Sequence, residues 1–203
     1  MGRVIVMNTV TLDGVMQGPA RPDEDTRDGF TQGGWAVPYS DEAGIAKMGE
    51  RMGTDHAFLF GRRTYEELLT VWNTRGGRFK DALNETHKYV ASSNPATHLE
   101  WPNSTLLAGD VPAAVAELKH TSPRNLVIMG SGVLIASLMA ADLIDEYLLL
   151  IAPLVLGNGR RLFSGGTHAS LRLVDSAATS TGVVIATYAN GQPTNRGALR
   201  SDR

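Results

Sequence analysis

Three segments of this chain share one layout, a short apolar run that ends in a turn of small residues. They are Phe58-Leu59-Phe60 before Gly61-Arg62-Arg63-Thr64, Tyr89-Val90-Ala91 before Ser92-Ser93-Asn94-Pro95, and Leu126-Val127-Ile128-Met129 before Gly130-Ser131-Gly132. Continuous apolar runs of this length are typical of buried parallel strands. Because ligands of open α/β sheets bind at the carboxyl ends of such strands, we expect the three turns to line one binding edge.

Two of the three turns lead into predicted helices. The first turn of a helix has N–H groups without intrahelical partners and the positive end of the helix dipole, so it binds phosphate without a dedicated side chain. Arginine forms forked hydrogen bonds with phosphate, and Arg62 and Arg63 therefore favour NADP over NAD. Together the turns predict a dinucleotide site.

Each of these turns also has a simpler interpretation. Gly130-Ser131-Gly132 is equally typical of a plain connection from strand to helix, and arginines after a strand are commonly solvated surface groups. Ser92, Ser93 and Asn94 form a turn before Pro95 whether or not they also donate to a phosphate.

Strands and helices alternate along most of the chain. Apolar runs predict strands over 4–12, 56–60, 88–91 and 126–129. We expect Ser40 to cap a helix that carries Asp41 in its first turn and runs to about residue 52. Thr64 and Glu67 predict a capping box for the next helix. Further helices are predicted over 79–85, from Asp110 to about 120, and from about 132.

After Tyr147 the pattern changes to apolar runs over 148–151, 171–174 and 183–188, separated by Pro153 and glycine-rich turns. This spacing predicts antiparallel strands. The predicted fold is therefore a single α/β domain, with a mixed, mainly parallel sheet flanked by helices and an antiparallel C-terminal edge. A chain of 203 residues fits one such domain over 1–190, and 191–203 is predicted to be a polar tail.

Composition excludes several classes of function. The absence of cysteine rules out disulfides, thiol catalysis and Cys-based zinc sites, and the five histidines show no paired metal-ligand spacing, so no metal is expected. A net charge of −2 predicts neither nucleic acid nor membrane as a partner. We expect a cytoplasmic protein whose partners are a small molecule and a second copy of the chain, with the apolar stretches 148–151 and 155–156 near the edge of the sheet as the dimer contact.

Two carboxylates and a tryptophan are candidates for contact with a substrate. Asp13 follows the first strand, where an Asp-Gly pair also makes an ordinary tight turn. Asp41 lies at a helix start that favours its ionised form, and it fits a carboxylate that accepts paired hydrogen bonds from a pterin or pyrimidine; a plain capping charge is the alternative. Trp35 either stacks on a heterocycle or fills the core. The long stretch 13–38 is predicted to be either a lid or a mobile loop.

The order and spacing of these motifs resemble the dihydrofolate reductase superfamily, and more closely its branch related to the reductase domain of the bifunctional riboflavin-biosynthesis deaminase-reductase. The resemblance covers about residues 3–190 and is carried by Thr11-Leu12-Asp13-Gly14, Gly33-Gly34-Trp35, Gly61-Arg62-Arg63-Thr64-Tyr65-Glu66, Ser92-Ser93-Asn94-Pro95, Gly130-Ser131-Gly132, Ile144-Asp145-Glu146, and Pro153-Leu154-Val155-Leu156-Gly157 with Leu162-Phe163.

The resemblance implies a mainly parallel sheet of eight strands, with NADPH across the strand ends and a mobile loop over the substrate. By this likeness Gly61, Arg62, Arg63 and Thr64 would hold the adenosine-phosphate end together with Ser92, Ser93 and Asn94, and the diphosphate would lie on Gly130, Ser131, Gly132, Val133 and Leu134. Asp41 falls where folate enzymes carry the carboxylate that binds the pterin. Asp13 is the rival candidate, because the riboflavin branch places other groups near the first strand.

The implied activity is NADPH-dependent transfer of a hydride to a C=N or C=O bond of a small heterocycle, of the pterin or ribosylamino-pyrimidine type. The alternative is a non-catalytic NADP(H)-binding or assembly protein that retains the pocket. Binding without turnover would distinguish the second from the first.

Overall fold

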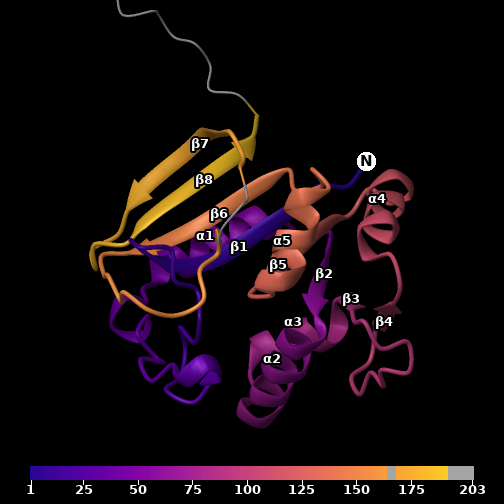
Figure 1. Ribbon diagram of the computed structural model, residues 1–203, viewed down its shortest axis with the longest axis horizontal. Helices are drawn as coiled ribbons and strands as arrows, with labels where there is room; N and C mark the ends of the chain where they lie inside the picture. Colours follow the sequence, from indigo (N-terminus) through magenta and orange to yellow (C-terminus); the bar gives the residue numbers. More distant parts are fainter. Residues whose placement is uncertain (164–167, 192–203) are drawn as a thin grey trace, which may run out of the picture.

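A computed structural model describes residues 1–163 and 168–191 of the chain. Its strands are β1 (Val4–Thr11), β2 (His56–Gly61), β3 (Lys88–Ala91), β4 (Ser104–Leu107), β5 (Asn125–Met129), β6 (Glu146–Ala152), β7 (Leu171–Ala178) and β8 (Val184–Asn190). They form one eight-stranded sheet in the order β4-β3-β2-β5-β1-β6-β8-β7 (Figure 1). The first six strands of that order are parallel, and β8 runs antiparallel to both β6 and β7. The predicted mixed, mainly parallel sheet with an antiparallel edge is confirmed.

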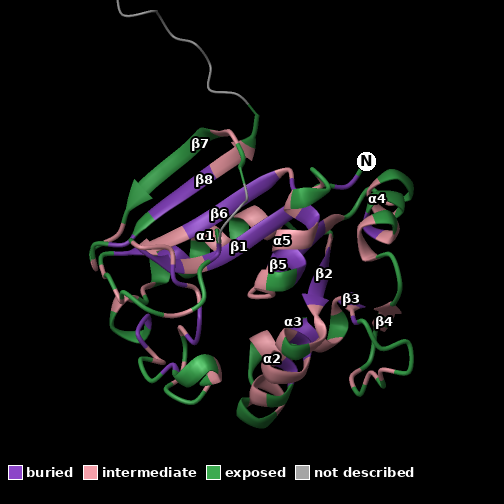
Figure 2. Cartoon of the chain, in the orientation of Figure 1, coloured by how far each residue is buried: buried purple, intermediate pink, exposed green. Residues whose placement is uncertain are grey.

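Helices cover both faces of this sheet. They are α1 (Glu42–Met52), α2 (Arg62–Arg75), α3 (Arg78–Glu85), α4 (Val111–Thr121) and α5 (Gly132–Ala140). Alternate residues of β1 point to opposite faces. Val4 and Val6 pack in a core with Ile135 of α5, whereas Ile5 and Met7 pack in a second core with residues of α2 and α3. The sheet is therefore buried on both faces at its centre (Figure 2).

The C-terminal third differs from prediction in one respect. β7 and β8 are antiparallel neighbours as expected, but β6 pairs in parallel with β1 on its other side. The apolar stretch 148–151 is therefore interior to the sheet, not near its edge. The edge strand on this side is β7, which is exposed along nearly its whole length (Figure 2). At the opposite edge lies β4, a strand that the sequence did not predict.

Two predicted helix starts are wrong in detail. Asp41, not Ser40, is the N-cap of α1, and its Oδ1 accepts a hydrogen bond from the N–H of Gly44 at 2.8 Å. The helix α2 begins at Arg62 without a side-chain cap, so the capping box of Thr64 and Glu67 does not form. Both side chains make tertiary contacts instead, which replace the local bonds that the pattern favoured.

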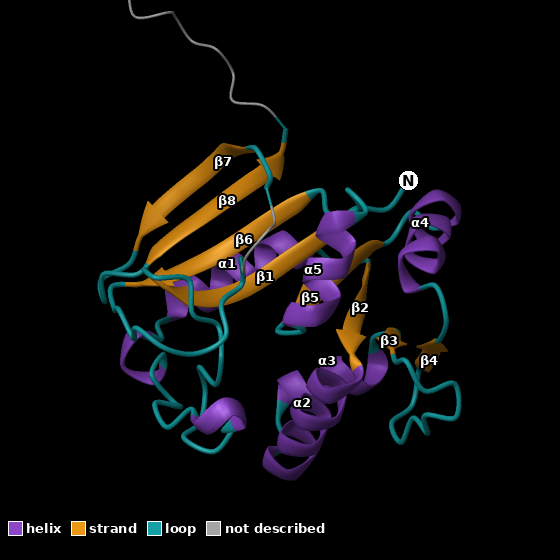
Figure 3. Cartoon of the chain, in the orientation of Figure 1, coloured by secondary structure: helices purple, strands orange, loops and turns teal. Residues whose placement is uncertain are grey.

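The connection between β1 and α1 is a long loop with two short 3-10 turns, at Arg27–Gly29 and Val37–Tyr39 (Figure 3). It has an apolar cluster of its own, made by Val15, Phe30, Trp35, Ala36 and Ala152. An ion pair between Arg21 and Glu67 ties this loop to α2. The loop predicted to be a lid is thus packed against the sheet and tied to α2. The predicted polar tail lies outside the described residues from 192 onward.

Ion pairs cluster at the end of the sheet where the parallel strands begin, which is the end opposite to their carboxyl ends. Glu146 is fully buried at the start of β6 and is paired with Arg51 of α1 and with Arg3, whose Nη2 lies 2.7 Å from Glu146 Oε2. The neighbouring Asp145 pairs with Lys119 of α4 at 2.7 Å. A buried carboxylate needs such partners to offset its lost hydration. The segment around 145–146 therefore joins both helical layers to the sheet.

Candidate functional site

The three turns found in the sequence come together in the structure. β3, β2 and β5 are consecutive parallel strands of the sheet, so the turns that follow them lie side by side at its carboxyl edge. α2 starts directly after β2, and α5 starts directly after β5 (Figure 1). Two helix N-termini therefore open onto the same edge.

Ser131 joins these two helix starts. The N–H of Gly61 donates to Ser131 Oγ at 2.9 Å, and the N–H of Ser131 donates to Thr64 Oγ1 at 3.1 Å. The preceding Gly130 has a φ of +61°, and a Cβ there would stand only 3.1 Å from the methyl group of Thr64. Only glycine fits both the backbone conformation and this close approach.

The first turn of α5 carries backbone N–H donors at the carboxyl edge of the sheet. Ser131 is its N-cap in the left-handed conformation, and the first turn is formed by Gly132, Val133 and Leu134. The N–H groups of a first helical turn have no partner within the helix. The side chain of Val133 is largely exposed, whereas that of Leu134 is buried beneath. This turn can accept an anionic group from solvent.

The two arginines of the second turn differ in their surroundings. Arg62 Nη1 donates to both carboxylate oxygens of Glu66, at 2.8 and 2.7 Å, along the surface of α2. Arg63 is exposed. One nitrogen of Arg62 is thus used by the helix itself, while Arg63 is the more accessible guanidinium for a ligand.

The third turn is built by its own side chains. Ser92 is buried, and its Oγ lies 2.7 Å from Thr97 Oγ1 and accepts a hydrogen bond from the N–H of Asn94. Asn94 Oδ1 accepts from the N–H of Ala96. The turn-forming interpretation of these residues is therefore observed. Ser93 is exposed at the tip of the turn.

Asp13 is held by a dense set of hydrogen bonds. Its Oδ1 accepts from the Thr11 hydroxyl at 2.6 Å, its Oδ2 accepts from the N–H of Gly157 at 2.9 Å, and Arg161 pairs with it at 3.2 Å. The bond from Thr11, together with those from the N–H groups of Leu156 and Gly157, holds the pKa of Asp13 well below its usual range. Asp13 is therefore an ionised link between the end of β1 and the loop after β6.

Asp41 has more capacity than Asp13 to accept hydrogen bonds from a ligand. Only Oδ1 is used by the helix cap, and the side chain is half-buried. A carboxylate accepts hydrogen bonds on both oxygens. Leu150 of β6 lies beneath the cap, because a Cβ on Gly44 would stand 3.2 Å from Leu150 Cδ2. Asp41 is thus set against an apolar part of the sheet.

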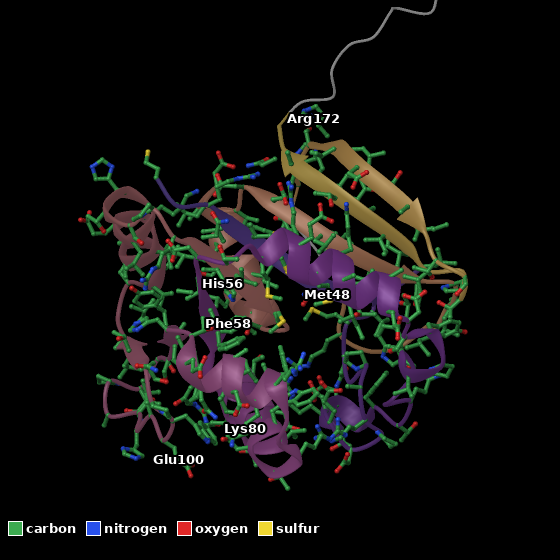
Figure 4. The ribbon with its side chains drawn as sticks, turned by 180° about the vertical axis from the view of Figure 1, so that it is seen from behind. Met48, His56, Phe58, Lys80, Glu100 and Arg172 are labelled. Atoms are coloured by element: carbon green, nitrogen blue, oxygen red, sulfur yellow. The ribbon has the colours of Figure 1, made fainter. Side chains whose placement is uncertain are left out.

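The face of the sheet beneath α1 and α2 is mainly apolar. Met48, Met129 and Leu150 are partly buried against the core on the face covered by α1 and α2, and Figure 4 shows Met48 and Phe58 on that face. Trp35 is not presented as a stacking surface, because its ring is buried in the loop cluster and its Nε1 donates to the carbonyl of Gln17 at 2.8 Å. The core-filling interpretation of Trp35 is the one observed.

Sequence reasoning missed Asn8, a buried polar residue of β1 beside the turn after β5. Its Oδ1 accepts a hydrogen bond from the N–H of Gly130 at 2.7 Å. A signal was present, because Asn8 interrupts an otherwise apolar face formed by Val4, Val6 and Val10. The pattern marks the residue as unusual, but only the structure shows what it contacts.

Two cavities lie away from the predicted site residues. One, of about 280 Å³, is lined by Met139, Asp142, Ile144, Tyr147, His168, Ala169, Ser170, Asn190 and Gly191. The other, of about 190 Å³, is lined by Gln17, Arg27, Asp28, Phe30, Asn158, Gly159 and Arg160. Within residues 1–163 and 168–191 no group of histidine and carboxylate side chains could hold a metal ion. In the same part of the chain, every helix is too short or too polar to cross a membrane.

Comparison with known proteins agrees with this architecture. The chain is 26% identical over 197 residues to YyaP of Bacillus subtilis. The matched region covers 92% of this chain and 94% of YyaP. A pyrimidine reductase-like protein from Corynebacterium diphtheriae has a similar structure, with a TM-score of 0.64 at 11% identity over 94% of this chain and 92% of that one. Dihydrofolate reductase from Enterococcus faecalis, complexed with NADP(H), has a TM-score of 0.60 at 15% identity over 94% of this chain and 98% of that one.

The two structural matches show the shared dihydrofolate-reductase-like fold. The family is shown by the sequence itself, because the family model of the RibD C-terminal domain matches residues 3–185. Members of this family and the structural neighbours are of the reductase type. The chain therefore belongs to the RibD C-terminal domain family.

Proposed function

We propose that the protein is an NADPH-dependent reductase, formed by one domain over 1–190, that transfers a hydride to a C=N or C=O bond of a small heterocycle. The observation that carries this proposal is the meeting of two helix N-termini and an exposed arginine at the ends of consecutive parallel strands. This donor set fits a dinucleotide phosphate. The dihydrofolate reductase that shares the fold was solved with NADP(H), which supports the choice of cofactor.

The phosphates are assigned to two places along this edge. The N–H groups of Gly132, Val133 and Leu134 at the start of α5 would hold the diphosphate. Arg63 and Ser93, both exposed, would hold the additional phosphate on the adenosine ribose. The nicotinamide ring would supply the hydride, and a proton from solvent would neutralise the nitrogen or oxygen of the reduced bond. The protein must position the ring and the heterocycle against each other.

Asp41 is the carboxylate that we assign to the substrate. Its second oxygen is not used by the helix cap and can accept a hydrogen bond from an amino or ring N–H group of a pterin or ribosylamino-pyrimidine. The apolar side chains of Met48 and Leu150 provide a surface for a flat ring. Asp13 is assigned a supporting role, because its oxygens already accept bonds from Thr11, Leu156 and Gly157.

The loop over 13–38 is proposed to cover the bound heterocycle. It is anchored at one side by Arg21 on Glu67 of α2 and at the other by Arg160 on Asp28, at 2.8 Å. Its apolar cluster gives it a defined shape. A covered site excludes water, which strengthens the hydrogen bonds to Asp41.

Thermal unfolding tests the cofactor assignment first. A ligand that binds only the folded state should stabilise it by about 2.7 kcal/mol at a hundred times its dissociation constant. We expect NADPH to raise the melting temperature much more than NADH at equal concentration. The absence of any shift with either would contradict the proposal.

Turnover tests the reaction. Loss of NADPH absorbance is followed with pterins, ribosylamino-pyrimidines and simple carbonyl compounds. We expect turnover with at least one heterocycle. Firm NADPH binding without turnover on any of them would instead favour a non-catalytic NADP(H)-binding or assembly protein.

We also propose a homodimer, with β7 in place of the interior stretch 148–151 as its contact. An exposed edge strand offers unpaired backbone groups to another chain. Leu173 and Val174 of β7 are 51% and 45% exposed. Light scattering at micromolar concentration should give twice the mass of one chain, and a single-chain mass would remove this part of the proposal.

A further inference from the structure

Asn8 occupies a place in β1 where the sheet pattern calls for an apolar residue. On the same face lie Val4, Val6 and Val10, all buried in the core beneath α5. Asn8 is itself only 5% exposed. A buried amide is costly unless it is hydrogen-bonded, so its partners indicate what it does.

Asn8 contacts Gly130, the first residue of the turn after β5, through both ends of its amide group, and its Nδ2 also lies 3.9 Å from Met16 Sδ. The register of β1 with β5 runs from Val4 opposite Leu126 to Met7 opposite Met129 and ends there. The next residue, Gly130, leaves the strand with a φ of +61°, and its N–H donates to Asn8 Oδ1 at 2.7 Å. The side chain of Asn8 therefore supplies the hydrogen-bond acceptor for Gly130, one residue beyond the last paired residues of β1 and β5.

The turn that Asn8 holds is one that does not form by itself. Gly130 is followed by Ser131, a residue with a side chain that also has a positive φ, of +57°. Such a conformation persists only where the surroundings hold it. One contact is the bond from the N–H of Ser131 to Thr64 Oγ1, and the bond to Asn8 is another. With these two N–H groups engaged, the next donors along the chain are those of the first turn of α5.

We propose that Asn8 is a positioning residue for the cofactor: it fixes the turn at Gly130 so that the first-turn N–H groups of α5 are aimed at the diphosphate. This inference rests on the proposed function. It assigns to Asn8 no contact with the cofactor. Loss of the Asn8 side chain should therefore weaken binding of the diphosphate while leaving recognition of the adenosine end intact.

The test compares two ligands in two variants. Asn8→Leu removes the acceptor for Gly130 while keeping a side chain of similar size. Asn125→Leu is the matched control, because Asn125 Oδ1 accepts the N–H of Arg3 at 3.3 Å at the other end of the same strand pair. Dissociation constants are measured for NADPH and for adenosine 2′-monophosphate, which carries the ribose phosphate but no diphosphate.

We expect Asn8→Leu to raise the dissociation constant for NADPH about tenfold or more, because it removes the hydrogen bond that fixes the turn at Gly130. The dissociation constant for adenosine 2′-monophosphate should rise less than about twofold. Asn125→Leu should leave both within about twofold. Equal weakening of the two ligands by Asn8→Leu, or no weakening in a folded variant, would overturn the inference.

If Asn8→Leu does not fold, Asn8→Ser takes its place in the same assay, because serine is too short to reach Gly130, and the same outcomes apply. Failure of the proposed function itself has a different signature, since the unmodified protein would then bind neither NADPH nor the monophosphate. An unmodified protein that binds NADPH, with an Asn8 variant that binds it equally well, removes only the role of Asn8.

Discussion

Ser131 and Thr64 connect the two helix starts of the candidate site through the bond from the N–H of Ser131 to Thr64 Oγ1, at 3.1 Å. The two residues are 67 positions apart and belong to different strand-to-helix turns. Their contact links two turns that are separate in the sequence.

Thr64→Val should destabilise the protein by about 1–3 kcal/mol, because it removes the acceptor and leaves the N–H of Ser131 unpaired. Urea unfolding measures this change. Thr70→Val is the control, since Thr70 is exposed on the same helix and should change stability by less than about 0.5 kcal/mol. Equal effects of the two substitutions would show that the contact adds nothing.

Arg63→Ala should reduce the preference for NADPH over NADH about tenfold or more, because a hydrogen bond to a charged group contributes about 1.5–3 kcal/mol. Arg62→Ala should have a smaller effect, since Glu66 already engages one of its nitrogens. The ratio of dissociation constants for the two cofactors is the measurement. Arg75→Ala, at the far end of α2, is the control and should leave the ratio unchanged. An unaltered ratio in the Arg63 variant would remove this residue from the phosphate site.

Asp41→Asn should lower turnover about tenfold or more, because a hydrogen bond from the heterocycle to a charged carboxylate contributes about 1.5–3 kcal/mol. Stability and NADPH affinity should be retained, because asparagine caps a helix as well as aspartate. The matched variant is Asp110→Asn, at the N-cap of α4, where Oδ1 accepts from the N–H of Ala113 at 3.0 Å. Both variants are compared by kcat and by urea unfolding. Full turnover in the Asp41 variant would contradict its assignment to the substrate.

Asp13→Asn should lower stability at neutral pH and not in strong acid. The pKa of Asp13 is depressed in the folded protein below its ordinary value of 3.8, so its carboxylate stabilises the fold above that pH. This contribution is lost as the pH falls below 3.8 through the folded-state pKa. The difference in unfolding free energy between the two proteins should therefore be constant from about pH 7 to about pH 5 and narrow in stronger acid.

Asp55→Asn provides the reference for that experiment, because Asp55 pairs with Arg124 at 2.8 Å on an exposed surface. Surface ion pairs contribute about 0–1 kcal/mol, so this variant should show little difference at any pH. A difference for Asp13→Asn that is the same at every pH would show that its carboxylate charge is not what stabilises the loop.

Much of the fold could be predicted from local patterns. The strands β2, β3 and β5 are continuous apolar runs because both faces of the sheet are covered, and their predicted bounds agree with the structure within one residue. The start of α4 was also predicted, since Asp110 caps it through a bond to a residue three positions on. These features depend on residues that are close together in the sequence, so local sequence patterns are sufficient to predict them.

Features that depend on distant partners could not be predicted in this way. β4 has a polar half and, among the strands that the structure describes, pairs with β3 alone, so it lacks the apolar pattern of an interior strand. Glu67 was predicted to close a capping box, but it pairs with Arg21, which lies 46 positions away. For the same reason the sequence placed 148–151 near the edge, whereas β6 lies between β1 and β8.

That three apolar strands end in turns of small residues follows from the local sequence, because strand and turn propensities depend on neighbouring residues. Which groups of those turns remain available to a ligand depends on contacts between distant segments. The side chain of Asn8 accepts from the N–H of Gly130, that of Thr64 from the N–H of Ser131, and that of Ser131 from the N–H of Gly61. Each of these bonds joins segments far apart in the chain, and such pairings are set by the packing of the whole sheet.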